Sequence, residues 1–481
     1  MMVNRILKSQ TFTSLFWVSL EKFGYSGVYF ISTIVLARLL TPSDFGLIGI
    51  LSIFISFSQM IVESGLGGAL VKKKNVTGED YNTIFTFNLA CSCILYIILF
   101  ICAPFIADFY KNEQLISLTR IVGLNIIISG FSLTQKVHLI RDLKFKKQTI
   151  ISIVALFISI IISISLAFYG FGVWALISQQ LCYNLFFCIL IFNVVKYKPK
   201  IKFNKKSFSE LYGFGSKIFA SSLLIVVFNE GVSSLIAKVY SLLITGFYYQ
   251  AKKLVDFPIN IFRALGDSIV FPLLSKISDQ AEFEKKSSLL MKLILLISFP
   301  LFIILFEFSD EVVFIVLGKQ WSKSAEMLNI LCLSSVGLII DTVSRNILKS
   351  TGNGSAILQS EVIKKIVGIV IILGAISFEL NIFLFSIVIA NLLGCVINMI
   401  YVNKITSYKF KSQAKDILPI ICIAVFSGLI ARKFIMIFSL NDMTNFILGS
   451  VIIIIIYSIL GLLFLIDKEI ILKIKSKIKF N

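Results

Sequence analysis

The sequence is poor in charged residues and contains a single histidine. Only 15% of its 481 residues are charged and 57% are hydrophobic, whereas a soluble domain usually carries about 25% charged residues. The mean hydropathy is +0.93. This composition excludes a soluble globular protein. Because His138 is the only histidine and lies in a basic segment, we expect no metal site built on histidine ligands.

The cysteines and the net charge also argue against several kinds of site and partner. The eight cysteines lie inside apolar segments, with no paired framework outside them, so we expect small apolar side chains and neither a disulfide nor a metal nor a cofactor. The net charge of +20 could indicate nucleic acid. However, the basic residues gather in short loops between apolar segments, where they orient a membrane protein. We therefore expect no nucleic-acid partner.

Apolar runs near the spanning length of about 20 residues recur from one end of the sequence to the other. They predict an all-α polytopic membrane protein with about 14 transmembrane helices and no separate catalytic domain. The first run is as long as a true membrane helix and is followed by no small-residue cleavage site, so we expect it to be retained. The predicted spans are 12–36, 45–70, 82–107, 114–135, 149–168, 172–195, 212–237, 246–275, 288–306, 325–345, 363–377, 381–403, 416–433 and 444–466.

Lysine and arginine gather in alternate loops, which predicts the orientation in the membrane. Both termini are expected on the cytoplasmic side, and this requires an even number of spans. The C-terminal tail, where lysines from Lys473 to Lys479 alternate mostly with isoleucine, predicts a segment that rests on anionic lipid. The basic loops hold Arg5 and Lys8, Lys72 to Lys74, Lys136, Arg141, Lys144, Lys146 and Lys147, Lys196 to Lys206, and Lys404, Lys409, Lys411 and Lys415.

The chain also contains a weak internal repeat. The stretch from Thr33 to Leu47 aligns without gaps on the stretch from Ser233 to Phe247. Six spans per half would make parallel repeats with a substrate site between them, and the last two spans would be an addition. The alignment pairs Ala37 with Ala237, Arg38 with Lys238, Thr41 with Ser241 and Gly46 with Gly246.

The eighth span carries the clearest polar stripe. Its members follow one another at intervals of four, four, three and four residues, so at about 100° per residue they share roughly one quarter of the helix surface. Such residues usually line a water-filled cavity, because a charge in lipid is costly. The alternative is that the end residues reach the membrane interfaces and the central ones pair with neighbouring helices. The stripe consists of Lys252, Asp256, Asn260, Arg263 and Asp267, with Pro258 as a predicted kink.

A second stripe lies on the first span. Lys22, Ser26, Tyr29 and Thr33 share one helix face, although Lys22 could instead form an ion pair with the adjacent Glu21. Buried carboxyl groups are also candidates for binding a proton or a sodium ion that drives transport. These coupling-ion candidates are Glu63, Glu230, Asp256 and Asp341.

The charges of the two stripes leave a cationic surplus. Lys22, Lys252, Lys253 and Arg263 outnumber Asp256 and Asp267. In a site of low dielectric this surplus favours a phosphate or pyrophosphate, which arginine can bind with two hydrogen bonds. We therefore predict a substrate-binding site for a pyrophosphate and glycan, formed by Lys22, Ser26, Tyr29, Lys252, Lys253, Asn260 and Arg263.

An ordered series of short motifs resembles the polysaccharide transporter family, which contains the Wzx-type O-antigen and exopolysaccharide flippases of the MATE-like superfamily. The resemblance covers about residues 12 to 280. The motifs are ARLLTPSDFG at 37–46, ESGLGGAL at 63–70, EDY at 79–81, RDLKF at 141–145, GFGVWA at 170–175, GFGSK at 213–217, GFYY at 246–249 and FP at 271–272.

The resemblance implies two six-helix lobes around a central cleft, plus two extra C-terminal helices. The corresponding domains are residues 1–205, 206–410 and 411–481. It also implies alternating access in the bacterial cytoplasmic (inner) membrane for undecaprenyl-pyrophosphate-linked oligosaccharides, with membrane lipids and a polysaccharide polymerase or chain-length machinery as partners. Where many relatives carry an arginine this chain has Gln250, and the neighbouring lysines would supply the charge.

Two other functions remain open at this stage. A drug or cation antiporter of the same superfamily would favour an acidic cavity, whereas the stripes are basic. A membrane glycan polymerase or ligase would need general acid or base groups near an outer-face substrate, and the outward loops are short and hold no histidine. The sequence therefore predicts a transporter and not an enzyme.

Overall fold

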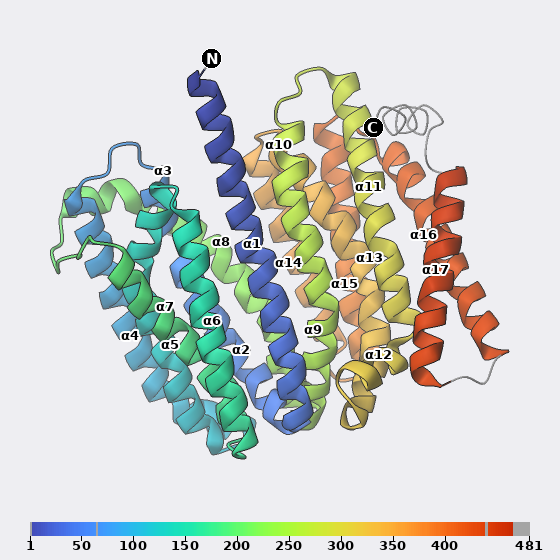
Figure 1. Cartoon of the computed structure of the whole chain (residues 1–481), viewed down its shortest axis with the longest axis horizontal. Coiled ribbons are helices and arrows are strands. Elements are labelled where there is room, and N and C mark those ends of the chain that lie inside the picture. Colours follow the sequence, from blue (N-terminus) through green and yellow to red (C-terminus); the bar gives the residue numbers. More distant parts are fainter. Residues whose placement is uncertain (1, 64–65, 438–440, 465–481) are drawn as a thin grey trace. The chain divides into compact units, whose positions relative to one another are not determined.

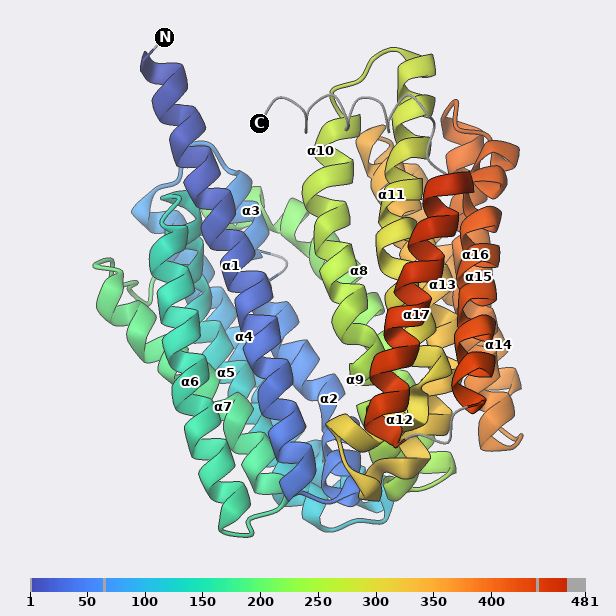
Figure 2. The ribbon, with the colours of Figure 1, turned by 45° about the vertical axis from the view of Figure 1, so that its right-hand side comes forward.

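The computed structural model describes residues 2–63, 66–437 and 441–464, and in these ranges the chain is helical with no strand. Two compact units are present, Met1–Tyr249 and Gln250–Asn481. Figures 1 and 2 show that within each unit the long helices run side by side. The predicted domain boundaries at residues 205 and 410 stay a prediction.

The first unit contains eight helices among the described residues and the start of a ninth. They are α1 (Met2–Leu39), α2 (Pro42–Glu63), α3 (Leu66–Lys72), α4 (Gly78–Tyr110), α5 (Gln114–Arg141), α6 (Phe145–Phe168), α7 (Val173–Val194), α8 (Lys205–Val239) and α9 (Leu242–Leu265). In this unit α5 packs against α2, α4 and α7, and α1 packs against α6.

The second unit continues α9 and adds the remaining helices. They are a π-helical turn (Gly266–Val270), α10 (Phe271–Leu274), α11 (Gln280–Glu307), α12 (Ser309–Val316), a 3₁₀ turn (Lys319–Trp321), α13 (Ser322–Ser350), α14 (Gly354–Gly374), α15 (Leu380–Ile405), α16 (Phe410–Met436) and α17 (Asp442–Phe464). The mostly buried α13 packs against α11 and α15, and α16 and α17 pack on α11.

Among the described residues, each of the fourteen predicted spans falls mostly on helices. In the described ranges, 11 helical segments are long and apolar enough to cross a membrane. The remaining three predicted spans fall on α1, α8 and α14, so the all-α membrane fold is confirmed while the count of fourteen stays a prediction. The predicted span 45–70 covers α2 and α3, with residues 64–65 between them outside the described part of the chain. The predicted span 246–275 is interrupted by the π-helical turn, although α9 continues through Pro258.

Local capping explains where several helices begin. Thr77 accepts a hydrogen bond from the backbone of Asp80, whose side chain in turn accepts one from the backbone of Thr77. This reciprocal pair satisfies two backbone N–H groups at the start of α4. Asn204 caps α8 by accepting hydrogen bonds from the backbone of Lys206 and Ser207, and Asp279 caps α11 by accepting one from the backbone of Glu282.

The internal repeat is visible as a reciprocal contact between α2 and the first two turns of α9. A Cβ atom added at Gly46 would lie 2.0 Å from the carbonyl oxygen of Leu242, and one added at Gly246 would lie 1.8 Å from that of Pro42. With the offset of 200 residues found in the sequence, each contact maps onto the other. Only glycine permits two helix backbones to approach this closely.

The same offset relates further features of this contact. The rings of Phe45 and Tyr249 lie tilted to each other with centroids 6.5 Å apart, while Thr245 lies against Gly49. The caps also correspond, because Asp44 N donates to the Thr41 hydroxyl and Ile244 N donates to the Ser241 hydroxyl. Reciprocal pairs of this kind are the signature of a two-fold interface. They support the duplication that sequence identity alone indicates only weakly.

Candidate functional site

The polar stripe predicted on the eighth span lies on α9 and the π-helical turn. Lys252 and Asp256 are half-buried, whereas Asn260, Arg263 and Asp267 are exposed. The guanidinium of Arg263 donates to the Asn260 side chain at 3.0 Å. The stripe therefore becomes more accessible towards the C-terminal half of α9.

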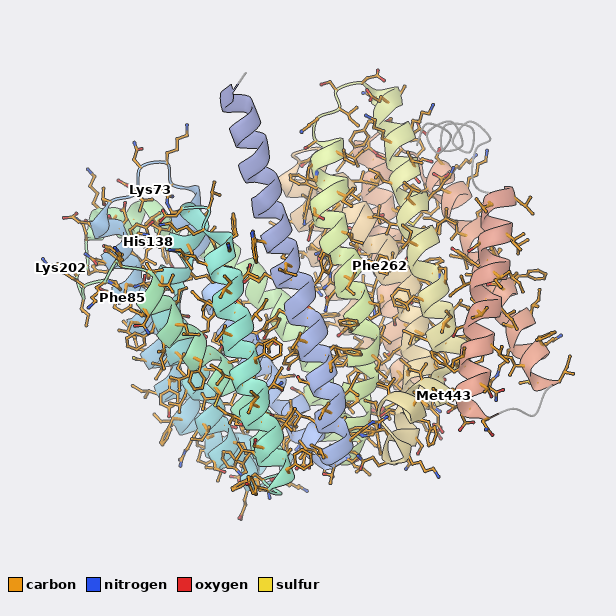
Figure 3. All side chains as sticks on the ribbon, viewed as in Figure 1. Lys73, Phe85, His138, Lys202, Phe262 and Met443 are labelled. Carbon is orange, nitrogen blue, oxygen red and sulfur yellow. The ribbon has the colours of Figure 1, made fainter. Side chains whose placement is uncertain are left out.

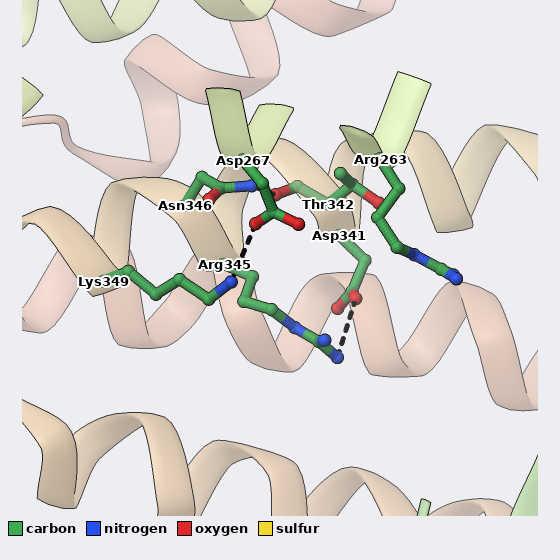
Figure 4. A pocket seen from close by; sticks show the side chains of 7 residues that line it. All are labelled: Arg263, Asp267, Asp341, Thr342, Arg345, Asn346 and Lys349. Carbon is green, nitrogen blue, oxygen red and sulfur yellow. Dashed lines mark hydrogen bonds and ion pairs between the residues drawn. The ribbon is translucent and has the colours of Figure 1, made fainter. Parts of the chain in front are cut away.

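A small polar pocket lies where the end of α9 meets α13 (Figure 4). Its cavity volume is about 40 Å³, and it is lined by Arg263, Asp267, Asp341, Thr342, Arg345, Asn346 and Lys349. Gly266 allows the two helices to come close, because a Cβ there would lie 2.9 Å from the Asn346 side-chain nitrogen. The π-helical turn, a feature frequent at functional sites, begins at this glycine.

Arg263 is the least neutralised cation of the pocket. Lys349 binds Asp267 at 2.8 Å, and Arg345 lies 3.9 Å from Asp341. Figure 4 shows the Arg263 side chain extending away from these two pairs. Within the described ranges, no carboxylate forms an ion pair with Arg263. Its guanidinium thus keeps most of its donors for another ligand.

At one wall of this pocket, the coupling-ion candidate Asp341 belongs to a half-buried ion network between α13, α14 and α15. It accepts hydrogen bonds from Lys364 at 2.9 Å and from Asn398 at 2.7 Å. Glu361 binds both Lys364 and Arg345 at 2.7 Å. A coupling cation at Asp341 would have to displace a tethered lysine. Sequence reasoning missed Glu361 and Lys364, although three charges at 361, 364 and 365 inside an apolar segment are a usable signal.

The coupling-ion candidate Glu230 occupies a different environment in the first unit. This half-buried carboxylate of α8 accepts hydrogen bonds from two hydroxyl groups of α2, Ser52 at 2.8 Å and Ser56 at 3.2 Å. Asp256 is half-buried on α9, and the side chain of Glu63 lies outside the described part of the chain, as does the lysine-rich tail.

The stripe predicted on the first span lies on α1. Lys22 is exposed, Ser26 and Tyr29 are half-buried, and Thr33 is buried with its hydroxyl bound to the Tyr29 carbonyl at 3.0 Å. Thr33 is therefore satisfied within its own helix, while the other end of the stripe is accessible.

The carboxylate of Glu21 is held by α6 and not by Lys22. Gln148 donates to it at 3.0 Å and Ser152 at 3.1 Å. The ion pair between Lys22 and Glu21, which the sequence left open, is not the arrangement found. This contact joins α1 to α6 and leaves Lys22 outside it. In the second unit, Lys253 is half-buried and Gln250 is buried.

Several of the family-like motifs build the first unit and do not reach the stripes. Arg141 donates to the carbonyls of Leu70 and Lys73, both at 2.6 Å, and so caps the end of α3. Lys73 in turn binds Asp80 and Glu210, both at 2.9 Å. The hydrogen bond with Asp80 raises the pKa of Lys73 above its ordinary value. Lys73 therefore stays charged and ties α4 to α8.

Comparison with known proteins gives a consistent result for much of the chain. The family described as "Polysaccharide biosynthesis protein" matches residues 35–326. The succinoglycan biosynthesis transport protein ExoT of Rhizobium meliloti is 24% identical over 71% of this chain and 69% of its own length. The lipopolysaccharide biosynthesis protein WzxC of Escherichia coli is 23% identical over 69% of this chain and 68% of its own length.

Solved structures show the same fold. The lipid II flippase MurJ in an inward closed conformation matches with a TM-score of 0.77 and 16% identity, covering 93% of this chain and 98% of that one. An inward-facing multidrug resistance MATE transporter of the MOP superfamily matches with a TM-score of 0.64 and 13% identity, covering 84% of this chain and 99% of the transporter.

Proposed function

Since the chain belongs to the polysaccharide biosynthesis protein family, we propose that it is a flippase for undecaprenyl-pyrophosphate-linked oligosaccharides. It carries these repeat units from the inner to the outer leaflet of the bacterial cytoplasmic membrane by alternating access. The product serves the synthesis of a surface polysaccharide such as O-antigen, capsule or exopolysaccharide. ExoT is named a transport protein and MurJ a flippase, and both names support this assignment.

The observation that carries the proposal is the exposed charge on α9. This helix belongs to a segment long and apolar enough to cross a membrane, yet Arg263 is exposed on it and no carboxylate in the described ranges pairs with it. A charged side chain facing lipid costs about 2.5–3.5 kcal/mol on insertion scales. The face that carries Arg263 must therefore meet water or an anionic ligand.

A pyrophosphate fits the chemistry of this face. The planar guanidinium of Arg263 can bind two phosphate oxygens at once, and the amide of Asn260 holds it at 3.0 Å. Lys22, Lys252 and Lys253 supply further positive charge, and Ser26 and Tyr29 supply hydroxyl groups for the glycan. Translocation requires no bond to be made or broken, so none of these residues acts as a catalyst.

The driving ion is a proton or a sodium ion bound by one of the candidates Glu63, Glu230, Asp256 and Asp341. Among the described candidates, Glu230 accepts hydrogen bonds from the hydroxyl groups of Ser52 and Ser56. Both termini face the cytoplasm, and a polymerase or chain-length machinery receives the product at the outer leaflet.

Ligand-induced stabilisation tests this assignment in the purified full-length protein. A polyprenyl pyrophosphate should raise the melting temperature, because a ligand at 100 times its Kd adds about 2.7 kcal/mol to the stability. The uncharged polyprenol of the same length should not. Stabilisation by a cationic dye and not by the pyrophosphate would instead support a drug exporter and refute the proposed substrate.

A further inference from the structure

The connection between α7 and α8 is an extended basic segment with an ordered backbone. We call residues 195–206 the strap. It contains no acidic residue and six exposed lysines, and within the described ranges no carboxylate forms an ion pair with any of them. Lys202 is labelled in Figure 3, at the same end of the first unit as Lys73. The six lysines are Lys196, Lys198, Lys200, Lys202, Lys205 and Lys206.

Side chains of α4 fix the course of the strap. Lys200 N donates to the Asn82 side chain at 2.7 Å, and Lys202 N donates to the Thr86 hydroxyl at 3.0 Å. Asn204 N then donates to the hydroxyl of Thr83, which lies three residues before Thr86, at 3.1 Å. The strap therefore descends along α4 as far as Thr86 and turns back, with residues 201–203 at its tip.

The length of α4 locates this tip relative to a bilayer. With 33 residues the helix is about 50 Å long, about 20 Å longer than the roughly 30 Å hydrocarbon core, so a helix centred in the bilayer extends about 10 Å beyond the core at each end. Thr86 lies eight residues after the first residue of α4, Gly78, or about 12 Å along the axis. The tip of the strap thus reaches the boundary between headgroups and hydrocarbon.

The side chains at the tip suit that boundary. Ile201 is 74% exposed and Phe203 is 53% exposed, although apolar side chains in contact with water are normally buried. Lys200 and Lys202 alternate with them along the extended backbone, so their ammonium groups can reach the headgroup layer while their stems stay against apolar surface. Aliphatic and aromatic side chains between lysines are the pattern of an interfacial anchor on anionic lipid.

We propose that the strap is a binding element for anionic phospholipid headgroups. Ile201 and Phe203 enter the acyl boundary, and the lysines around them bind the phosphates of the surrounding leaflet. Because the start of α8 is hydrogen-bonded to the first turn of α4, through Asn204 to Glu79 and Ser207 to Asp80, anionic lipid at the strap stabilises the junction between the two helices. The inference does not depend on the proposed transport substrate.

Fluorescence quenching in nanodiscs tests the strap directly. In the full-length Phe203→Trp protein, the added emission should be quenched by brominated lipid, and more strongly by brominated phosphatidylglycerol than by brominated phosphatidylcholine in an equal mixture. The preference should fall as salt is raised. Quenching that ignores the headgroup, or no quenching at all, would overturn the proposal.

A second experiment removes positive charge from the strap. Adding Lys198→Gln, Lys200→Gln and Lys202→Gln to the Phe203→Trp protein should lower the preference for phosphatidylglycerol by about tenfold or more. The matched control removes the same charge elsewhere, with Lys276→Gln, Lys285→Gln and Lys411→Gln, three exposed lysines of the second unit, and should leave the preference intact. Equal losses in both triple variants would refute a specific role for the strap.

Discussion

Replacing Gly246 with alanine is expected to slow transport strongly while leaving the protein folded. The added Cβ would lie 1.8 Å from the Pro42 carbonyl oxygen, and a backbone atom cannot move aside without separating α2 from the first turns of α9. Overpacking of this kind costs about 1–3 kcal/mol, which corresponds to a shift of about 5- to 150-fold between two conformations. We expect translocation in proteoliposomes to fall by a factor in this range.

The reciprocal contact makes this prediction unusually specific. Gly46→Ala should have the same effect, because its Cβ would meet the Leu242 carbonyl oxygen at 2.0 Å. The double variant should be little worse than either single one, since all three lose the same contact. Gly374→Ala is the control, because a Cβ there meets nothing within 4 Å. Normal transport by either glycine variant, or fully additive losses, would show that the contact is not part of the cycle.

Arg263→Gln is expected to lower translocation of a lipid-linked oligosaccharide by about ten- to a hundredfold. A hydrogen bond to a charged partner contributes about 1.5–3 kcal/mol, and glutamine keeps the polarity of the site but loses the charge. Arg263→Lys should retain part of the activity, because a point charge replaces a bidentate donor. The rate is measured in proteoliposomes at equal protein density.

The control for Arg263 is another cation on a membrane-crossing helix. Lys433→Gln removes an exposed charge from the end of α16, outside both stripes, and should transport like the unmodified protein. Equal amounts of folded protein in the membrane exclude an insertion defect. If Arg263→Gln transports at the unmodified rate, Arg263 does not bind the substrate.

The sequence predicts the helices well because their determinants are local. A run of about 20 apolar residues is sufficient to identify a membrane helix, and the intervals of four and three residues place the α9 stripe on one face. The π-helical turn at Gly266 follows from its approach to Asn346 on α13, which no local pattern contains.

Partners from distant segments explain the remaining differences. Nothing in the sequence around Glu21 indicates that Gln148 and Ser152 of α6 will hold it. Likewise, Asp341 meets Lys364 only because α13 and α14 pack together in the second unit. The repeat is the opposite case. Its few matched residues become persuasive once Gly46 and Gly246 are found to make the same contact from opposite sides.

Translocation by the purified protein tests the central claim most directly. A polyprenyl-pyrophosphate oligosaccharide is placed in proteoliposomes, and its appearance on the opposite leaflet is followed by its accessibility to an added glycosidase. The account predicts that the accessible fraction rises with the amount of protein and falls in Arg263→Gln. A fraction that equals that of protein-free liposomes for several glycans, together with export of a cationic dye, would contradict it.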